Sequence, residues 1–273
     1  MYEVYWQLEQ KPFENVADPR FYYPGESQQA ALLKLRYVVE SRHGGTLLAG
    51  PSGCGKTLLL RLLQQTLGKD CSPMLHLVFP QMSPVELMAY LAAELTAADL
   101  SSGCPSVPES VLRIERFFAE NTREGKHAVI VIDEAHLLHD AQTFESLRLL
   151  LNFESGGRPG MTLILAGQTG LLPALARMPQ LEERLAVKCL LRPFVEQETA
   201  AYVEHRLKIA GARRPIFEPA ALTTLHELTH GIARRINRLC DLALLIGYAE
   251  AQRTINAEQL ESVNNELVTV VPE

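Results

Sequence analysis

One stretch of the chain decides the fold: Gly50-Pro51-Ser52-Gly53-Cys54-Gly55-Lys56-Thr57. It matches the pattern G-x-x-x-x-G-K-[ST], follows the apolar run Thr46–Ala49 and opens a Leu-rich helical segment, which is the context that this motif requires. Its glycines allow backbone N–H groups to point inward around phosphates, and the helix N-terminus adds partial positive charge. The sequence therefore predicts a nucleoside triphosphate site.

The residues of this loop have separate expected roles. Lys56 would reach the β- and γ-phosphates, and the hydroxyl of Thr57 would hold Mg²⁺. The nucleotide-binding residues expected are Gly50, Pro51, Ser52, Gly53, Cys54, Gly55, Lys56, Thr57 and Leu58. The alternative is a glycine-rich turn that carries Lys-Thr by chance.

Two adjacent acids follow the apolar run Ala128–Ile132. Asp133, at the tip of this expected strand, would hold Mg²⁺ directly or through water. Glu134 would polarise the attacking water, because hydrolysis needs a base near that nucleophile. The alternative is a solvated strand end with cap-forming acids. Residues 133–136 also spell Asp-Glu-Ala-His, the box of one helicase class. Other helicase motifs are not recognisable, so His136 is interpreted as a packing or relay residue.

Three further polar residues are candidates for the same chemistry. Gln168 comes just after the run Thr162–Ala166, where it would orient water near the γ-phosphate if that strand lies beside the acidic one. Arg184 precedes the last expected strand, and Arg234 begins a helix after Gly231. Guanidinium groups suit a developing phosphate charge. The alternatives are an ordinary loop amide and solvated arginines.

Strand-like and helical patterns alternate up to Pro193, and only helical patterns follow. The expected strands are Thr46–Ala49, Met74–Phe79, Ala128–Ile132, Thr162–Ala166 and Leu185–Leu191. This alternation predicts an α/β fold with a parallel sheet covered on both faces. The expected domains are an aromatic arm over residues 1–25, an α/β domain over 26–192 and a helical domain over 193–273.

The N-terminal arm is rich in aromatic residues and is punctuated by prolines. The favoured interpretation is that its rings cover the edge of the sheet. The alternatives are that Phe21, Tyr22 or Tyr23 packs near the adenine of a nucleotide, or that the arm docks on a neighbouring subunit.

Composition excludes several classes of protein. The 273 residues are 47% hydrophobic and 21% charged, which excludes a disordered, collagen-like or small disulfide-stapled chain. The net charge of −6 argues against nonspecific binding to nucleic acid. No apolar run reaches the roughly 18 residues of a transmembrane helix, and the first residues lack a signal-peptide pattern. The five scattered cysteines favour reduced thiols in a cytoplasmic protein.

Together these motifs resemble those of AAA+ ATPases of the P-loop NTPase class. The resemblance narrows to the ExeA/GspA-type family of secretion and pilus systems through Lys11-Pro12-Phe13, Ala17–Tyr22, Glu198–Leu207 and Gly231–Asp241. It implies a three-layer α/β/α sheet of strand order 5-1-4-3-2, a helical lid, ATP with Mg²⁺ as ligands, and ATP hydrolysis. Ala233 departs from the family, which usually has Pro at that position.

The resemblance also implies roles and partners. Gln168 matches sensor 1, Arg184 matches a finger offered to the neighbouring subunit's nucleotide, and Arg234 matches sensor 2. A homo-oligomer, as a ring or filament, would remodel an unknown protein partner. Two alternatives remain: a regulator of transposition type that assembles on duplex DNA through clusters such as Arg213-Arg214, and a slow nucleotide switch.

Overall fold

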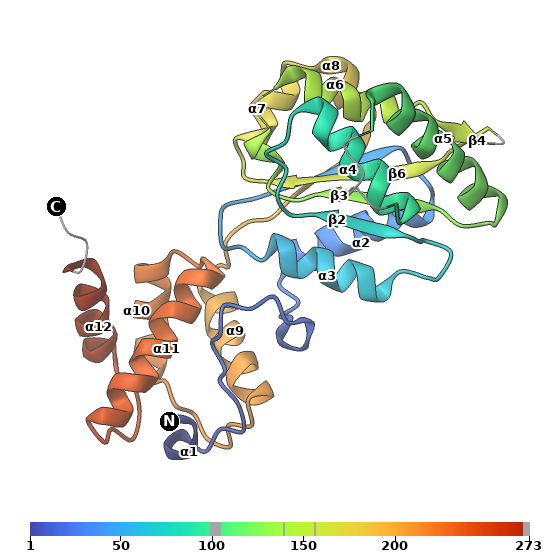
Figure 1. Cartoon of the computed structure of the whole chain (residues 1–273). Helices are drawn as coiled ribbons and strands as arrows, with labels where there is room; N and C mark the ends of the chain where they lie inside the picture. The colour runs from blue at the N-terminus through green and yellow to red at the C-terminus, as the bar shows by residue number, and fades with distance from the viewer. Residues whose placement is uncertain (99–104, 139, 156, 270–273) are drawn as a thin grey trace. The chain divides into compact units, whose positions relative to one another are not determined.

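The computed structural model describes residues 1–98, 105–138, 140–155 and 157–269 (Figure 1). The chain divides into two compact units. The helical unit comprises Met1–Glu26, Pro51–Leu58 and Arg192–Glu273, and the sheet unit comprises Ser27–Gly50 and Leu59–Leu191. No helix within the described ranges combines the length and the apolar character needed to cross a bilayer.

The sheet unit is built on five parallel strands in the order β2-β3-β6-β1-β7. Their bounds are β1 Gly45–Ala49, β2 Met74–Leu77, β3 Ala128–Ile132, β6 Met161–Gly167 and β7 Leu185–Leu190. Numbered one to five along the chain, these strands have the order 5-1-4-3-2, which confirms the expectation. Strand β2 ends two residues earlier than predicted, because its last ladder bond runs from Asp133 N–H to Leu77 O at 2.8 Å. Val78 and Phe79 beyond it are exposed.

Helices cover both faces of this sheet, as expected for buried apolar strands. Figure 1 shows α4, α5 and α6 on one face and α2 and α3 on the other. The helices that lie wholly or mostly in this unit are α2 Glu26–Glu40, α3 Lys56–Thr66, α4 Pro84–Thr96, α5 Val107–Arg123, η2 Ala135–Leu137, α6 Ala141–Leu150, α7 Leu171–Ala176 and α8 Pro179–Glu182. Two short strands, β4 Glu154–Ser155 and β5 Arg158–Pro159, form a separate antiparallel pair.

The first turn of α4 illustrates how local sequence sets a helix boundary. The Ser83 hydroxyl accepts a hydrogen bond from Glu86 N–H at 3.3 Å, and the Glu86 carboxylate accepts one from Ser83 N–H at 2.9 Å. Pro84 occupies the first helical position, where its missing N–H has no cost. The sequence Ser83-Pro84-Val85-Glu86 itself predicts a helix start, with a capping Ser, Pro at the first position and Glu at the third. The reciprocal capping confirms that prediction.

The helical unit contains only helices and turns among its described residues, apart from an isolated bridge between Phe217 and Ile255. Its helices are α1 Glu3–Trp6, η1 Pro19–Phe21, α9 Glu196–Ile209, α10 Pro219–Thr229, α11 Ala233–Ala249 and α12 Ala257–Thr269. Glycines follow α9 and α10, at Gly211 and Gly231, where the backbone is left-handed. The helical tail expected after Pro193 is therefore present.

The N-terminal arm packs into the helical unit, which corrects the expectation that its rings cover the sheet edge. Tyr2, Trp6 and Phe13 are buried in the core formed by α9, α10, α11 and α12. Trp6 Nε1 donates to Leu244 O at 2.9 Å, which satisfies the one polar atom of a fully buried indole. The sequence pattern identified the rings as core material but gave no indication of which apolar surface they cover.

Candidate functional site

The phosphate loop has the left-handed backbone that its glycines permit. Gly53 and Gly55 have φ values of 82° and 89°, a region that side chains disfavour. At Gly53 a second constraint applies, because an added Cβ would lie 2.8 Å from the Cβ of Arg234. The loop therefore requires glycine at this position both for its conformation and for the approach of α11.

Arg234 contacts the phosphate loop directly within the helical unit. Its backbone N–H donates to Gly53 O at 3.1 Å, and its Nη1 lies 3.5 Å from Ser52 Oγ. The guanidinium remains exposed. The structure thus brings Arg234 to the loop, although 182 residues separate it from Ser52 in the sequence.

Two other loop residues are largely buried. Lys56 is 6% exposed, and its ammonium donates to Pro51 O at 3.0 Å, so its charged end is held at the loop. Cys54 is 4% exposed, and burial raises the pKa of its thiol, with the Lys56 charge acting in the opposite direction. The Cys54 thiol therefore stays protonated near neutral pH, which disfavours oxidation.

The two acids lie at the carboxyl end of β3 in the sheet unit, and Asp133 is fixed by hydrogen bonds. Asp133 is 1% exposed; its Oδ1 accepts the Glu134 N–H at 2.9 Å, and its Oδ2 lies 3.2 Å from His76 Nε2. His76, on β2, was not singled out from the sequence. Its position opposite Val131 follows from the strand pairing, which a single sequence does not reveal.

Glu134 differs from its neighbour in being partly exposed and in having a strained backbone. Its side chain is 40% exposed, and its φ of 51° places a non-glycine residue in the left-handed region. Its Oε2 lies 3.3 Å from His136 Nδ1, and the same nitrogen lies 3.4 Å from the backbone N of Gln168. Strand β6 pairs with β3, so Gln168 follows the strand adjacent to the acids, as expected.

Arg184 lies at the opposite end of the strands from the two acids. It immediately precedes β7, which runs parallel to β1, so it lies at the amino ends of the strands whereas Asp133 and Gln168 lie at the carboxyl ends. Its Nη2 donates to Asn152 Oδ1 at 3.1 Å. Within one chain the sheet unit therefore does not bring Arg184 to the acids.

The predicted residues thus form two groups, each held within one unit. The helical unit holds Arg234 against the loop of residues 51–58, and the sheet unit gathers Asp133, Glu134, His136 and the backbone of Gln168. Among the described residues, no group of three or more His, Cys, Asp or Glu side chains could hold a metal ion by itself.

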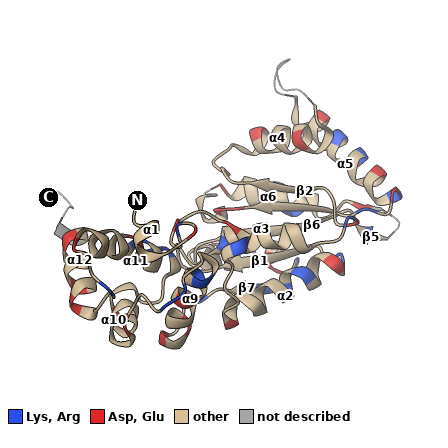
Figure 2. Cartoon of the chain, turned by 90° about the horizontal axis from the view of Figure 1, so that it is seen from below, with Lys and Arg blue, Asp and Glu red and all other residues tan. Residues whose placement is uncertain are grey.

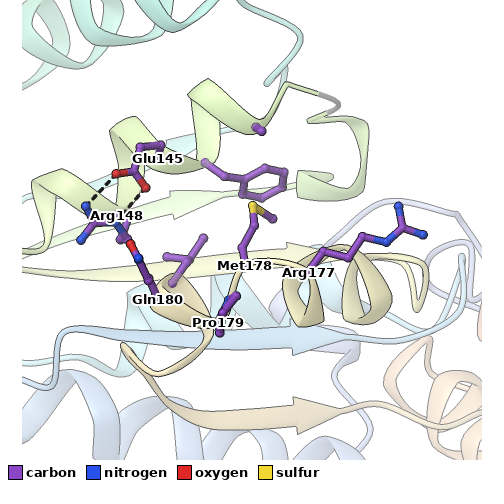
Figure 3. Close-up of a pocket in the computed structure, with 9 residues that line it drawn as sticks. Glu145, Arg148, Arg177, Met178, Pro179 and Gln180 are labelled. Atoms are coloured by element: carbon purple, nitrogen blue, oxygen red, sulfur yellow. Dashed lines mark hydrogen bonds and ion pairs between the residues drawn. The ribbon is translucent and has the colours of Figure 1, made fainter.

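A separate cavity of about 340 Å³ lies between α6 and the segment of α7 and α8 (Figure 3). Phe144 and Met178 contribute apolar lining, and Glu145 forms an ion pair with Arg148 at its rim. None of the predicted site residues lines this cavity. It is therefore distinct from the site predicted by the motifs.

The comparisons with known proteins agree with this arrangement. Residues 39–175 match the AAA domain family. The chain is 34% identical over 259 residues to General secretion pathway protein A of Aeromonas hydrophila, a match that covers 93% of this chain and 46% of that protein. The chain thus spans about half the length of this curated relative.

Solved structures share the fold at low sequence identity. The ORC2 protein of Aeropyrum pernix has a TM-score of 0.71 at 16% identity, over 94% of this chain and 72% of that one. The Cdc6p protein of Pyrobaculum aerophilum gives the same TM-score at 16% identity, over 96% of this chain and 74% of that one. The RuvB Holliday junction branch migration motor of Thermotoga maritima has a TM-score of 0.62 at 18% identity, over 91% of this chain and 73% of that one. With its matching domain, parallel sheet and helical region, this chain belongs to the AAA domain family.

Proposed function

We propose that this chain hydrolyses ATP with Mg²⁺ and uses the cycle to assemble or remodel a protein complex. The observation that carries the proposal is the pair of carboxylates after β3: Asp133 is buried and fixed by hydrogen bonds, and Glu134 is partly exposed beside His136. A metal-binding acid beside a base is the arrangement that phosphoryl transfer to water requires.

The loop and the acids fit ATP and Mg²⁺ chemically. Gly50–Leu58 would bind the phosphates through backbone N–H groups and through Lys56, and Thr57 and Asp133 would supply hard oxygen ligands. Mg²⁺ would neutralise phosphate charge when bound. Magnesium usually takes one or two carboxylates together with substrate phosphates, so the absence of an all-protein cage among the described residues is compatible with it. Glu134 would accept a proton from the attacking water, and Gln168 would orient that water.

Arg234 and Arg184 would act from different chains. Arg234 would serve as a sensor for the phosphates, because it already contacts the loop. Arg184 would contact the nucleotide of a neighbouring subunit. It lies at the amino ends of the parallel strands, and its own acids lie at the carboxyl ends, one strand length away at a rise of about 3.3 Å per residue. We therefore propose a homo-oligomer, as a ring or filament, with a helical lid over residues 193–273, an α/β domain over 26–192 and an arm over 1–25.

The similarity to General secretion pathway protein A supports a partner in a secretion or pilus system and a cytoplasmic location for this chain. The comparison covers less than half of that protein. The identity of the remodelled partner is accordingly part of the proposal.

Steady-state ATP turnover, measured with Mg²⁺ over a range of protein concentrations, tests the proposal. Glu134→Gln should lower kcat by about 10²- to 10⁴-fold because it removes the base, while nucleotide binding persists. Lys56→Ala should lose binding as well. Glu261→Gln, an exposed change on α12, is the matched control and should leave turnover unchanged. A Glu134→Gln chain that hydrolyses ATP at the parent rate would remove the catalytic assignment. Binding without turnover in the parent would indicate a slow nucleotide switch.

A second candidate, a DNA-bound regulator, is favoured by exposed arginines of the helical unit, namely Arg213, Arg214, Arg235 and Arg238. Against it, Figure 2 shows acidic residues along α12 and mixed charges along α5. ATP turnover that requires duplex DNA, with binding that weakens steeply as salt rises, would support this candidate. Turnover that rises with protein concentration and ignores DNA would support the first.

A further inference from the structure

The imidazole of His136 lies between two parts of the site that the motifs treat separately. Its Nδ1 is 3.3 Å from Glu134 Oε2 and 3.4 Å from the backbone N of Gln168. Both distances are slightly longer than the usual hydrogen-bond range of about 2.7–3.2 Å, so neither partner holds Nδ1 closely. The side chain is 18% exposed, so its position is set mainly by the protein.

The packing around His136 makes this approach specific. A Cβ added to Gly167 would lie 3.0 Å from His136 N and 3.4 Å from His136 Nδ1. The end of β6 therefore carries a glycine where η2 passes over it. The left-handed backbone of Glu134, at φ 51°, turns the chain into η2 and so delivers His136 to this point.

The two contacts of Nδ1 need opposite chemical forms of that atom. To bond the Glu134 carboxylate, Nδ1 must carry a proton and donate it; to accept the Gln168 N–H, it must present a lone pair. One neutral imidazole nitrogen cannot do both at once. The carboxylate and the end of β6 therefore compete for the same atom.

We propose that His136 is a positioning residue for Glu134, and that exchange of its Nδ1 between the Glu134 carboxylate and the Gln168 N–H couples the base to the end of β6. Donation from Nδ1 holds the exposed carboxylate in one orientation. When Glu134 engages water, the imidazole gives up its Nδ1 proton and takes one at Nε2 by exchange with solvent, which leaves a lone pair on Nδ1. Nδ1 then accepts the Gln168 N–H and so fixes the residue that orients that water. This inference rests on the proposed ATP hydrolysis.

Three substitutions at His136 test the role of Nδ1 in turnover. Asn places an amide near the position of Nδ1, with both a donor and an acceptor, whereas Gln places its amide near Nε2. We expect His136→Ala and His136→Gln to lower kcat about tenfold to a hundredfold with KM unchanged, because misplacing a reacting group by about 1 Å has effects of this size. His136→Asn should retain most of the parent kcat. His43→Asn, before the amino end of β1, is the matched control and should have no effect.

Nuclear magnetic resonance tests the geometry without relying on turnover. In the ¹⁵N-histidine-labelled chain, Glu134→Ala should shift the Nδ1 resonance of His136 and leave that of His43 in place. In the uniformly labelled chain, His136→Ala should shift the amide resonance of Gln168. Parent-like kcat in His136→Ala, or equal losses in His136→Asn and His136→Gln, would overturn the inference. Unchanged resonances would do the same. A parent chain that binds no ATP would overturn the proposed function alone, and the resonances would still decide the contacts of His136.

Discussion

The cores of the two units are built from different side chains. The sheet unit packs aliphatic residues from strands that are buried along their whole length, such as Ala128–Ile132 and Met161–Gly167. The helical unit packs aromatic rings, including Trp6, Phe13 and Tyr202, many of them in edge-to-face pairs. Aliphatic packing tolerates exchange among similar side chains, whereas rings with polar atoms require specific partners.

The two units also differ in how far apart in the sequence their contacting residues lie. In the sheet unit, each strand is joined to the next by helices of the same segment of chain. In the helical unit, the arm supplies rings whose hydrogen-bond partners follow about 240 residues later: Trp6 bonds to Leu244 O, and Tyr5 O–H donates to Gln252 O at 2.6 Å. Arg206 likewise holds the arm by donating to Glu14 O at 3.1 Å. The helical unit therefore depends on a few long-range contacts.

The largest expected effect comes from breaking one of these contacts. Trp6→Ala removes a fully buried ring and leaves a cavity, so it should destabilise the helical unit by about 3–5 kcal/mol. Amide hydrogen exchange should show the loss in α9 and α11, with the strands of the sheet unit still protected. Tyr37→Ala removes a ring that is 57% exposed in the sheet unit and is the control. Equal loss of protection in both units would contradict the comparison.

A buried histidine provides the next largest effect, in the sheet unit. Burial, reinforced by the Arg42 charge, lowers the pKa of His127 from 6.5 to about 4, and its Nε2 lies 2.8 Å from Thr162 Oγ1. At a pH between these two pKa values, His127 is protonated in the unfolded chain and neutral in the folded chain. The free energy of unfolding should therefore fall as the pH drops from 6.5 towards 4, by at most about 3 kcal/mol.

Urea unfolding at several pH values, followed by a probe in the sheet unit, measures this dependence. His127→Gln removes the titrating group and should flatten the slope in that window, although the variant is less stable at neutral pH. A parent-like slope in His127→Gln would assign the pH dependence to other groups.

The smallest effect concerns the local cap of α4. Ser83→Ala removes the acceptor for Glu86 N–H and should destabilise the sheet unit by about 1 kcal/mol. Ser83→Asp keeps an acceptor at the cap and should recover most of the loss. Thermal unfolding of the three chains measures the difference, and equal stability of the Ala and Asp variants would refute the capping role.

Sequence predicted what depends on local pattern and motif. The five strands, the capping box at Ser83 and the glycine-rich loop before a helix follow from periodicity, capping preferences and motif spacing. The contacts of His76 with Asp133 and of His136 with Gln168 depend on which strands become neighbours, which no local pattern contains. The arm was wrongly assigned to the sheet edge because an aromatic ring is equally suited to any apolar surface.

The docking of Trp6 on α11 has a consequence for biosynthesis. The ribosome adds Trp6 near the start of translation, whereas Leu244, whose carbonyl accepts the indole hydrogen bond, is added 238 residues later. At about 5–20 residues per second, translation of that interval takes roughly 12–48 s. The sheet unit is completed within this time, so it can form on the ribosome while the rings of the arm still lack their core. Those rings then form a transient apolar segment on the nascent chain, which chaperones can bind until α11 emerges.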